Sequence, residues 1–242
     1  MTRTDRTWPV PARAWTMRMH WHDVLFMHWP IAMAAVAKHL PDGLTLDTFD
    51  GQAWIGVVPF RMSDVAPRGM PAFPWLSAFP ELNVRTYVTA GDKPGVWFFS
   101  LDAASPIAVR VARFFFHLKY MDARMSIVLD DGWYDYSSCR THRNEPVAEL
   151  NVKYRPLGEP FCAPAGALEH WLTSRYCLYT ANRRGQLLRG EIDHPSWPLR
   201  LAEAEVTKNT MLDSLGLELL AKSPHLLFAK EIAVQAWTTE RV

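Results

Sequence analysis

One short segment of the chain, residues 81–88 with the sequence ELNVRTYV, alternates polar and apolar side chains. The side-chain period of two of a β-strand places one set on a common face: Glu81, Asn83, Arg85 and Tyr87. On an open sheet this face would be solvated, but in a closed sheet it lines an interior polar site. In that case Arg85 is the natural clamp for a carboxylate, because its planar guanidinium donates two parallel hydrogen bonds.

Lys119 and Tyr120 come just before a second extended segment. An amine whose pKa is lowered by burial or by a neighbouring cation can form a Schiff base, so Lys119 is a candidate catalytic residue. The alternative is a solvated lysine at a helix exit, close to the last carbonyl groups of the helix. Tyr120 and Trp29 are candidate ligand contacts, with core packing as the alternative for both.

The sequence gives only weak signals for a metal or cofactor site. His20 and His22 lie two positions apart, and Asp23 and His28 follow, but two imidazoles need a third ligand to hold zinc. We interpret them as ordinary strand histidines and predict neither a metal nor another cofactor. Dinucleotide-binding, P-loop, nucleophile-elbow and H-E-x-x-H motifs are absent from the sequence.

Extended segments dominate the rest of the chain. We predict about twelve strands, at 16–26, 44–51, 52–62, 81–88, 95–102, 123–132, 133–140, 148–156, 175–181, 186–194, 199–206 and 225–237. Too few helices separate them for a doubly wound parallel sheet. The predicted fold class is therefore α+β, with a mostly antiparallel, β-barrel-like sheet and about three peripheral helices.

The clearest helix begins at Ser105 as N-cap, with Pro106 in the first helical position. Its apolar residues form one stripe, consisting of Ile107, Val111, Phe114, Phe115 and Leu118. Further helices are predicted at 30–39 and 165–173, and a short turn at 209–215 closed by Gly216. The proline-rich segment 61–80 is predicted to be a loop whose Phe73, Trp75 and Phe79 pack down.

Composition excludes several classes of protein. The 242 residues contain 49% hydrophobic and 21% charged residues, as in a globular chain, and we expect a single domain over 1–242 with an irregular arm at 1–13. A net charge of +1 provides no field for nucleic acid, and no apolar run reaches the about 20 residues of a membrane span. An odd count of three cysteines and an N-terminus without a secretory segment indicate the cytoplasm.

Six segments together resemble the YqjF-like family (domain of unknown function 2071): WHDVLFMHW at 21–29, the run LPDGLTLDTFDGQAWIGVVPFRM at 40–62, ELNVRTYV at 81–88, AR-x-F-F-x-L-x-Y-x-x-A-x-M at 112–125, YRPLGEP at 154–160 and WLTSRYCLY at 171–179. The match spans nearly the whole chain. That family is similar in fold to acetoacetate decarboxylase, which implies a barrel-like domain with a ligand cavity, often in homo-oligomers.

The resemblance also implies what is missing. In acetoacetate decarboxylase a helix runs into R-E-L-x-x-Y-P-K-K-L-G, where one lysine forms the Schiff base and the adjacent lysine lowers its pKa. Laid over residues 113–123, this segment places its two lysines at Tyr120 and Met121. Lys119 falls one position earlier, where the YqjF-like pattern usually has proline, and a one-residue shift along a strand redirects the side chain.

Three hypotheses follow from the sequence. The first is a cytoplasmic protein whose cavity binds a small acidic or polar organic molecule, such as a carboxylate, through Arg85, Asn83, Tyr87, Tyr120 and Trp29. The second is a decarboxylase-like or aldolase-like enzyme that uses Lys119 as the Schiff-base amine. The third is a structural, oligomer-forming protein without ligand chemistry, in which the eleven tryptophans serve packing and a subunit interface. The first is our main hypothesis; nucleic acid and membrane are not expected partners.

Overall fold

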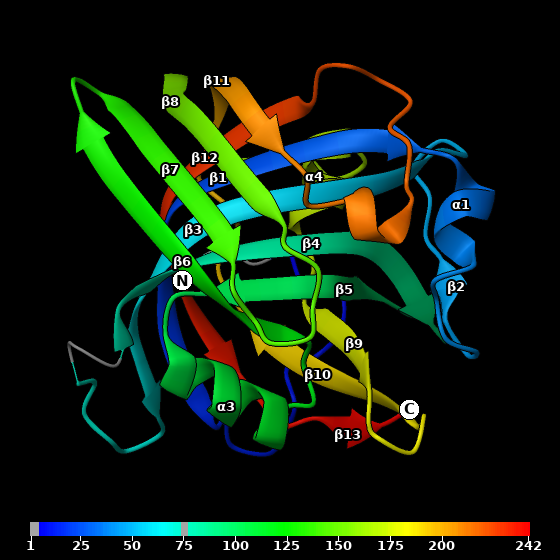
Figure 1. The fold of residues 1–242 in the computed structure, drawn as a ribbon. Helices are drawn as coiled ribbons and strands as arrows, with labels where there is room; N and C mark the ends of the chain where they lie inside the picture. Colours follow the sequence, from blue (N-terminus) through cyan, green and yellow to red (C-terminus); the bar gives the residue numbers. More distant parts are fainter. Residues whose placement is uncertain (1–4, 74–76) are drawn as a thin grey trace.

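The computed structural model describes residues 5–73 and 77–242 and consists mainly of one mixed sheet (Figure 1). Its thirteen strands are β1 (Met17–Ile31), β2 (Thr45–Leu46), β3 (Ala53–Pro67), β4 (Phe79–Ala90), β5 (Lys93–Ala103), β6 (Tyr120–Asp130), β7 (Trp133–Arg140), β8 (Glu149–Phe161), β9 (Cys177–Ala181), β10 (Leu187–Asp193), β11 (Leu199–Asn209), β12 (His225–Ala236) and β13 (Glu240–Arg241). Each predicted strand overlaps one of these, and only the two-residue β13 was missed. The predicted fold class is confirmed.

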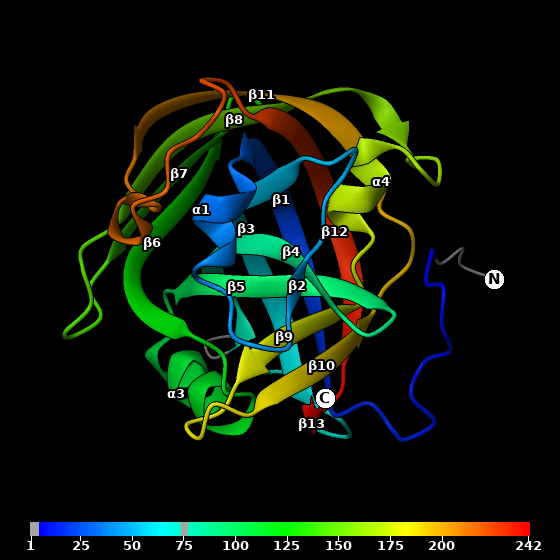
Figure 2. The same ribbon diagram turned by 90° about the vertical axis from the view of Figure 1, so that its right-hand side faces the viewer.

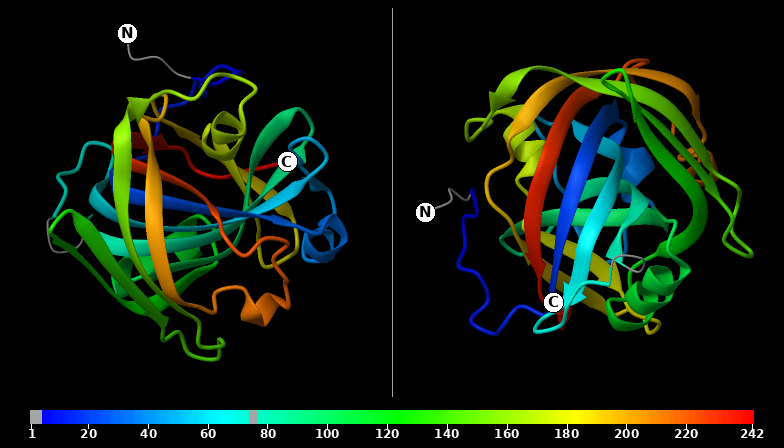
Figure 3. Two further views of the ribbon diagram at one scale, coloured as in Figure 1. Left: turned by 90° about the horizontal axis from the view of Figure 1, so that it is seen from above. Right: turned by 90° about the vertical axis from the view of Figure 1, so that its left-hand side faces the viewer.

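The sheet closes into a ring. From β5 the order runs β6, β7, β8, β11, β12, β1, β3 and β4, and a pairing of β4 with β5 completes the circle. Strands β9 and β10 form a second connection, because β9 pairs with β5 and β10 pairs with β12. The neighbouring strands β12, β1 and β3 form one wall, seen in red, blue and cyan in the right panel of Figure 3.

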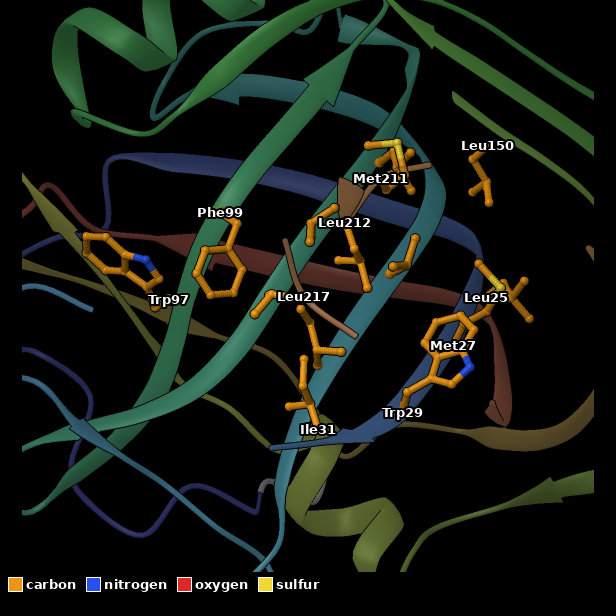
Figure 4. Close-up of a cluster of buried hydrophobic side chains, with 14 of the residues drawn as sticks. Leu25, Met27, Trp29, Ile31, Trp97, Phe99, Leu150, Met211, Leu212 and Leu217 are labelled. Atoms are coloured by element: carbon orange, nitrogen blue, oxygen red, sulfur yellow. The ribbon is translucent and has the colours of Figure 1, made fainter. Parts of the chain in front are cut away.

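This wall separates two buried interiors. The first, called the filled interior below, holds a large cluster of packed apolar side chains; Figure 4 shows Leu25, Met27, Trp29, Ile31, Trp97 and Phe99 among them. The second interior holds Val24 and Phe26 on the opposite face of β1. Asp23, at φ 54°, lies where the pairing of β1 with β3 shifts register. Such an irregularity reverses which face a residue occupies, so Trp21 before it and Phe26 after it reach the same interior.

The helices lie around the ring (Figure 2). Within residues 5–73 and 77–242 they are α1 (Met33–Ala37), α3 (Pro106–Phe115), α4 (Leu168–Thr173) and the 3-10 turn η1 (Asp213–Leu215). The N-cap of α3 is confirmed, since Ser105 Oγ accepts from the Ala108 N–H at 3.3 Å. The helix predicted at 30–39 starts later, because β1 continues to Ile31, opposite Ala53 of β3. No helix among the described residues is long and apolar enough to cross a membrane.

Three residues of the predicted apolar stripe of α3 do not pack inward. Phe114 and Phe115 are 72% and 63% exposed, and Ile107 is 54% exposed. The residue of α3 that is fully buried is Val109, and small alanines at 108 and 112 form the contact with the protein. Alanine allows the helix backbone to approach the sheet closely, so the larger apolar residues are left on the outer side.

The loop prediction for 61–80 was wrong at both ends. β3 extends to Pro67 and β4 starts at Phe79, where Pro80 pairs with Arg61. Pro67 is tolerated as the last residue of its strand. Phe79 is buried, as predicted, but Phe73 is 47% exposed and does not pack down. Trp75 lies outside the described residues, as do residues 1–4 of the predicted N-terminal arm; residues 5–16 contain no helix or strand.

Candidate functional site

A cavity of about 170 Å³ occupies the second interior, between the strands β1, β3 and β4 on one side and the helix α3 on the other. Most of its lining is apolar, including Trp21, Phe26, Phe60 and Trp197. Fewer of its lining side chains are polar; they are Glu81, Asn83, Arg85, Tyr120, Thr173, Arg175, Glu191, His194 and Thr239. Glu191 is already paired with Lys93, at 2.7 Å. An apolar cavity with a few convergent polar groups is the usual form of a small-molecule site.

Strand β4 supplies the polar side of the cavity. Glu81, Asn83 and Arg85 all line it, whereas Leu82 and Val84 on the other face pack in the filled interior. The predicted alternation along residues 81–88 is therefore present in the structure. The polar face is buried and not solvated, since Glu81 is 1% and Asn83 8% exposed.

Tyr87 continues this face but lies beyond the cavity. Its hydroxyl is 2.6 Å from Nε2 of the buried His28, and its ring packs against Trp171 at 4.6 Å between centroids. Burial, followed by the charge of Arg85, lowers the pKa of His28 well below its usual range, so this ring is neutral. Tyr87 therefore supports the cavity wall next to Arg85.

Glu81 and Tyr120 form a pair inside the cavity. The Tyr120 hydroxyl donates to both carboxyl oxygens of Glu81, at 3.1 and 3.0 Å. The pKa of Glu81 is raised to about 8, mainly by burial. Hydrogen bonds from Tyr120 and Asn83 oppose this rise, and the nearby charge of Asp102 adds to it. At neutral pH Glu81 is thus mostly a carboxylic acid, which can donate a proton or a hydrogen bond to a ligand.

Four buried polar atoms of the cavity lining have no hydrogen-bond partner among the described residues. They are Trp21 Nε1, Asn83 Oδ1, Arg85 Nε and Arg175 Nη2. Leaving such a group without a partner costs about 1 to 3 kcal/mol. Three of the four are donors, so an acceptor-rich ligand would satisfy most of them.

Two residues of this set are cations, Arg85 and Arg175, and only Arg85 lacks a carboxylate partner among the described residues. Its Nη2 donates to the Leu172 carbonyl at 3.3 Å, and its guanidinium carbon lies 5.7 Å from the centroid of the Phe26 ring. In the part of the chain that the structure describes, no carboxylate lies within 4.0 Å of it. Arg175, in contrast, is paired with Asp47 at 2.5 Å and donates to the Trp171 carbonyl.

Arg175 and His194 were not predicted as site residues. Both come from the outer part of the ring, where α4 precedes β9 and β10 ends. Burial lowers the pKa of His194 to about 4, and its ring stacks on Tyr176 at 4.5 Å. No pattern in one sequence shows that these segments meet β4, although Arg175 falls inside the WLTSRYCLY segment.

Besides Tyr87, two more predicted site residues lie outside the cavity. Trp29 packs in the filled interior on the other side of the wall, because it is an odd-numbered residue after the irregularity at Asp23. Lys119 lines a different cavity, and its Nζ lies 5.3 Å from the centroid of the Trp97 ring. None of the residues that line the Arg85 cavity is a lysine. Among the described residues there is also no group of three side chains that could hold a metal ion.

Comparison with known proteins agrees with this architecture. Residues 18–233 match the model of the family DUF2071, described as an uncharacterized conserved protein. The uncharacterized protein YqjF of Bacillus subtilis (strain 168) is 44% identical over 228 residues, which cover 94% of this chain and 93% of that protein.

Solved structures with the same fold are much more distant in sequence. The enduracididine biosynthesis enzyme MppR, complexed with pyruvate, superposes with a TM-score of 0.65 at 9% identity, over 98% of this chain and 92% of the other. An acetoacetate decarboxylase from Legionella pneumophila gives 0.62 at 12% identity, over 98% and 92%. An acetoacetate decarboxylase-like enzyme from Sphingomonas wittichii RW1 gives 0.62 at 13% identity, over 100% and 99%. The resemblance inferred from the sequence is confirmed: the chain belongs to the YqjF (DUF2071) family and has an acetoacetate decarboxylase-like fold.

Proposed function

We propose that the Arg85 cavity binds a small organic acid. The observation that carries this proposal is the guanidinium of Arg85, which lines a mostly apolar cavity without a carboxylate partner among the described residues. A carboxylate there would accept two hydrogen bonds from Arg85 and compensate its charge. The apolar residues around it would hold the rest of the molecule.

The other unpartnered atoms add to this preference. Trp21 Nε1 and Arg175 Nη2 are further donors, and Asn83 Oδ1 is the one free acceptor. The protonated Glu81 adds a donor or proton source at neutral pH. One fold neighbour, MppR, is described with pyruvate, itself a small carboxylate. These features support an acid with further oxygen atoms over a purely apolar ligand.

Covalent chemistry through Lys119 is not part of the proposal, because this lysine lines another cavity. The proposal therefore names binding and leaves the reaction open. We also propose that the protein acts in the cytoplasm, since its three cysteines are unpaired and the thiol of Cys177 is buried.

A thermal-shift screen tests the proposal. Small carboxylates such as pyruvate and acetoacetate are added to the wild type, to Arg85→Ala and to the matched control Arg124→Ala, whose side chain is exposed. A ligand at 100 times its Kd contributes about 2.7 kcal/mol, which corresponds to a rise in Tm of about 5 to 10 °C.

We expect this rise in the wild type and in Arg124→Ala, and its loss in Arg85→Ala. Arg85→Lys should recover only part of it, because an ammonium group cannot form the two parallel hydrogen bonds. Equal stabilisation of wild type and Arg85→Ala, or no stabilisation of the wild type by any of the acids, would contradict the proposal.

The homo-oligomer stays a prediction. The exposed apolar side of α3, with Phe114 and Phe115, is the surface that an interface of this kind would use. Size-exclusion chromatography with light scattering measures the mass directly.

A further inference from the structure

A second cavity, of about 510 Å³, opens on the other side of β5 and β6. Its rim is formed by the exit of α3, the start of β6, the end of β9 and the turn η1. The first and third of these meet where the Thr180 hydroxyl donates to the His117 carbonyl at 2.6 Å; the elements can be followed in Figure 2. We refer to this space as the Lys119 cavity.

The charged side chains of the Lys119 cavity are mostly basic. Four of them are cationic: Arg113, Lys119, Arg140 and Arg183. The only acidic residue among those that line it is Glu145. Arg140 is neutralised from behind by Asp102, since Nε lies 3.1 Å from both carboxyl oxygens. Four positive charges less the charges of Asp102 and Glu145 leave two uncompensated.

Arg140 is the fixed element of this group. It is 3% exposed, and its Nη2 donates to Ser100 Oγ at 2.9 Å, which leaves Nη1 without a partner in the described part of the chain. Lys119, Arg113 and Arg183 have no carboxylate within 4.0 Å among the residues that the structure describes. Like charges held together in a partly enclosed space repel one another unless an anion lies between them.

The rest of the lining is apolar and includes Phe99, Met121, Met211 and Leu215. An inorganic anion would use only the cationic side, whereas an organic anion would use both. A phosphate monoester carries about −1.5 to −2 charges at pH 7, which matches the two uncompensated positive charges. From these observations we infer that the Lys119 cavity binds a small organic phosphate monoester, with the phosphate among Lys119, Arg140 and Arg183.

This site is separate from the Arg85 cavity, and none of its lining residues is assigned by the family description or by the proposed function. The two cavities lie on opposite sides of β5 and β6, and Leu118 is the one residue that lines both of them. Failure of one proposal therefore leaves the other standing.

Isothermal titration calorimetry with phenyl phosphate as the probe tests this inference. Arg140 is left unchanged, because its removal would bury Asp102 without a partner. The variants are Lys119→Gln and Arg183→Gln, with Arg184→Gln as the matched control, since Arg184 is the exposed neighbour that does not line the cavity. We expect about tenfold weaker binding for each of the first two and no change for the control.

Two further variants serve as controls. One shows whether a loss of binding is due to misfolding, and the other shows whether phenyl phosphate binds in the Arg85 cavity instead. Glu145→Gln removes the single acidic side chain of the lining, so it should tighten binding several-fold, a gain that an unfolded protein cannot show. Arg85→Ala should bind phenyl phosphate as the wild type does. Raising the salt concentration should weaken binding in all folded variants.

Several outcomes would overturn the inference. These are no binding of phenyl phosphate by the wild type, equal binding by wild type and Lys119→Gln, loss of binding in Arg85→Ala, and equal binding of benzoate and phenyl phosphate. The affinity for inorganic phosphate is measured as well. If it equals the affinity for phenyl phosphate, the apolar part of the lining does not contribute to binding, and the inference that the ligand is an organic ester is refuted.

Discussion

Replacing Glu81 by glutamine should change how the stability of the protein depends on pH. Glutamine has the shape of the neutral carboxylic acid and keeps an oxygen that can accept from Tyr120. The pKa of Glu81 is raised from 4.5 to about 8 in the folded protein, so the native state holds a proton that the unfolded state has lost. A raised pKa of an acid therefore stabilises the native state at low pH, and this contribution is lost as the pH rises from 4.5 to about 8.

The size of the effect follows from these two pKa values. Within this window the loss is about 1.4 kcal/mol per pH unit, and it levels off near pH 8. Between pH 6 and pH 7.5 the wild type should lose about 2 kcal/mol through this group alone. Asp102, whose pKa is raised to about 6 by burial, contributes little in this range and does so equally in wild type and Glu81→Gln.

Guanidinium chloride unfolding, followed by the fluorescence of the eleven tryptophans, measures the free energy of unfolding at each pH. The difference between Glu81→Gln and wild type should shift by about 2 kcal/mol in favour of the variant between pH 6 and 7.5. The control is Glu205→Gln, at an exposed position of β11, which should follow the wild type. Parallel curves for wild type and Glu81→Gln would refute the reasoning, because they would mean that Glu81 is ionised throughout.

Three further substitutions test individual contacts, each through the free energy of unfolding. Ser105→Ala removes the N-cap of α3 and should cost about 1 kcal/mol, with Ser105→Thr as the tolerated variant; no loss would show that the cap is unimportant. Gly95→Ala places a Cβ within 2.7 Å of the Cys177 carbonyl and should cost about 1 to 3 kcal/mol, while an unchanged stability would contradict this close approach. Tyr87→Phe leaves the buried His28 ring without its partner and should cost about 1 to 3 kcal/mol; a stability equal to that of the wild type would show that the contact is not formed.

Local patterns predicted the strands and the face that carries the site. The alternation along residues 81–88 placed Glu81, Asn83 and Arg85 together, and all three line the cavity. The chemistry of Ser105 and Pro106 predicted the start of α3, because capping depends on neighbouring residues only. Features that depend only on neighbouring residues, such as the alternation of a strand and the cap of a helix, could therefore be predicted from the sequence.

Features that depend on contacts between distant segments could not be predicted from the sequence. The register shift at Asp23 placed Trp29 in the other interior, and a simple period of two cannot show such a shift. Arg175 and His194 reach the cavity only because β9 and β10 join the ring between β5 and β12. The outward side of α3 has the periodicity of a buried helix, and only the structure shows that alanines form its contact.

The part of the sheet formed by β1, β3 and β4 has buried side chains on both of its surfaces, so none of these strands has a side in contact with solvent along most of its length. Its backbone amides should therefore be the slowest in the molecule to exchange hydrogen for deuterium. A molecule that binds next to Arg85 would contact strands whose opposite face packs in the filled interior. Ligand binding in the Arg85 cavity should consequently change the fluorescence of tryptophans on the opposite face, such as Trp29.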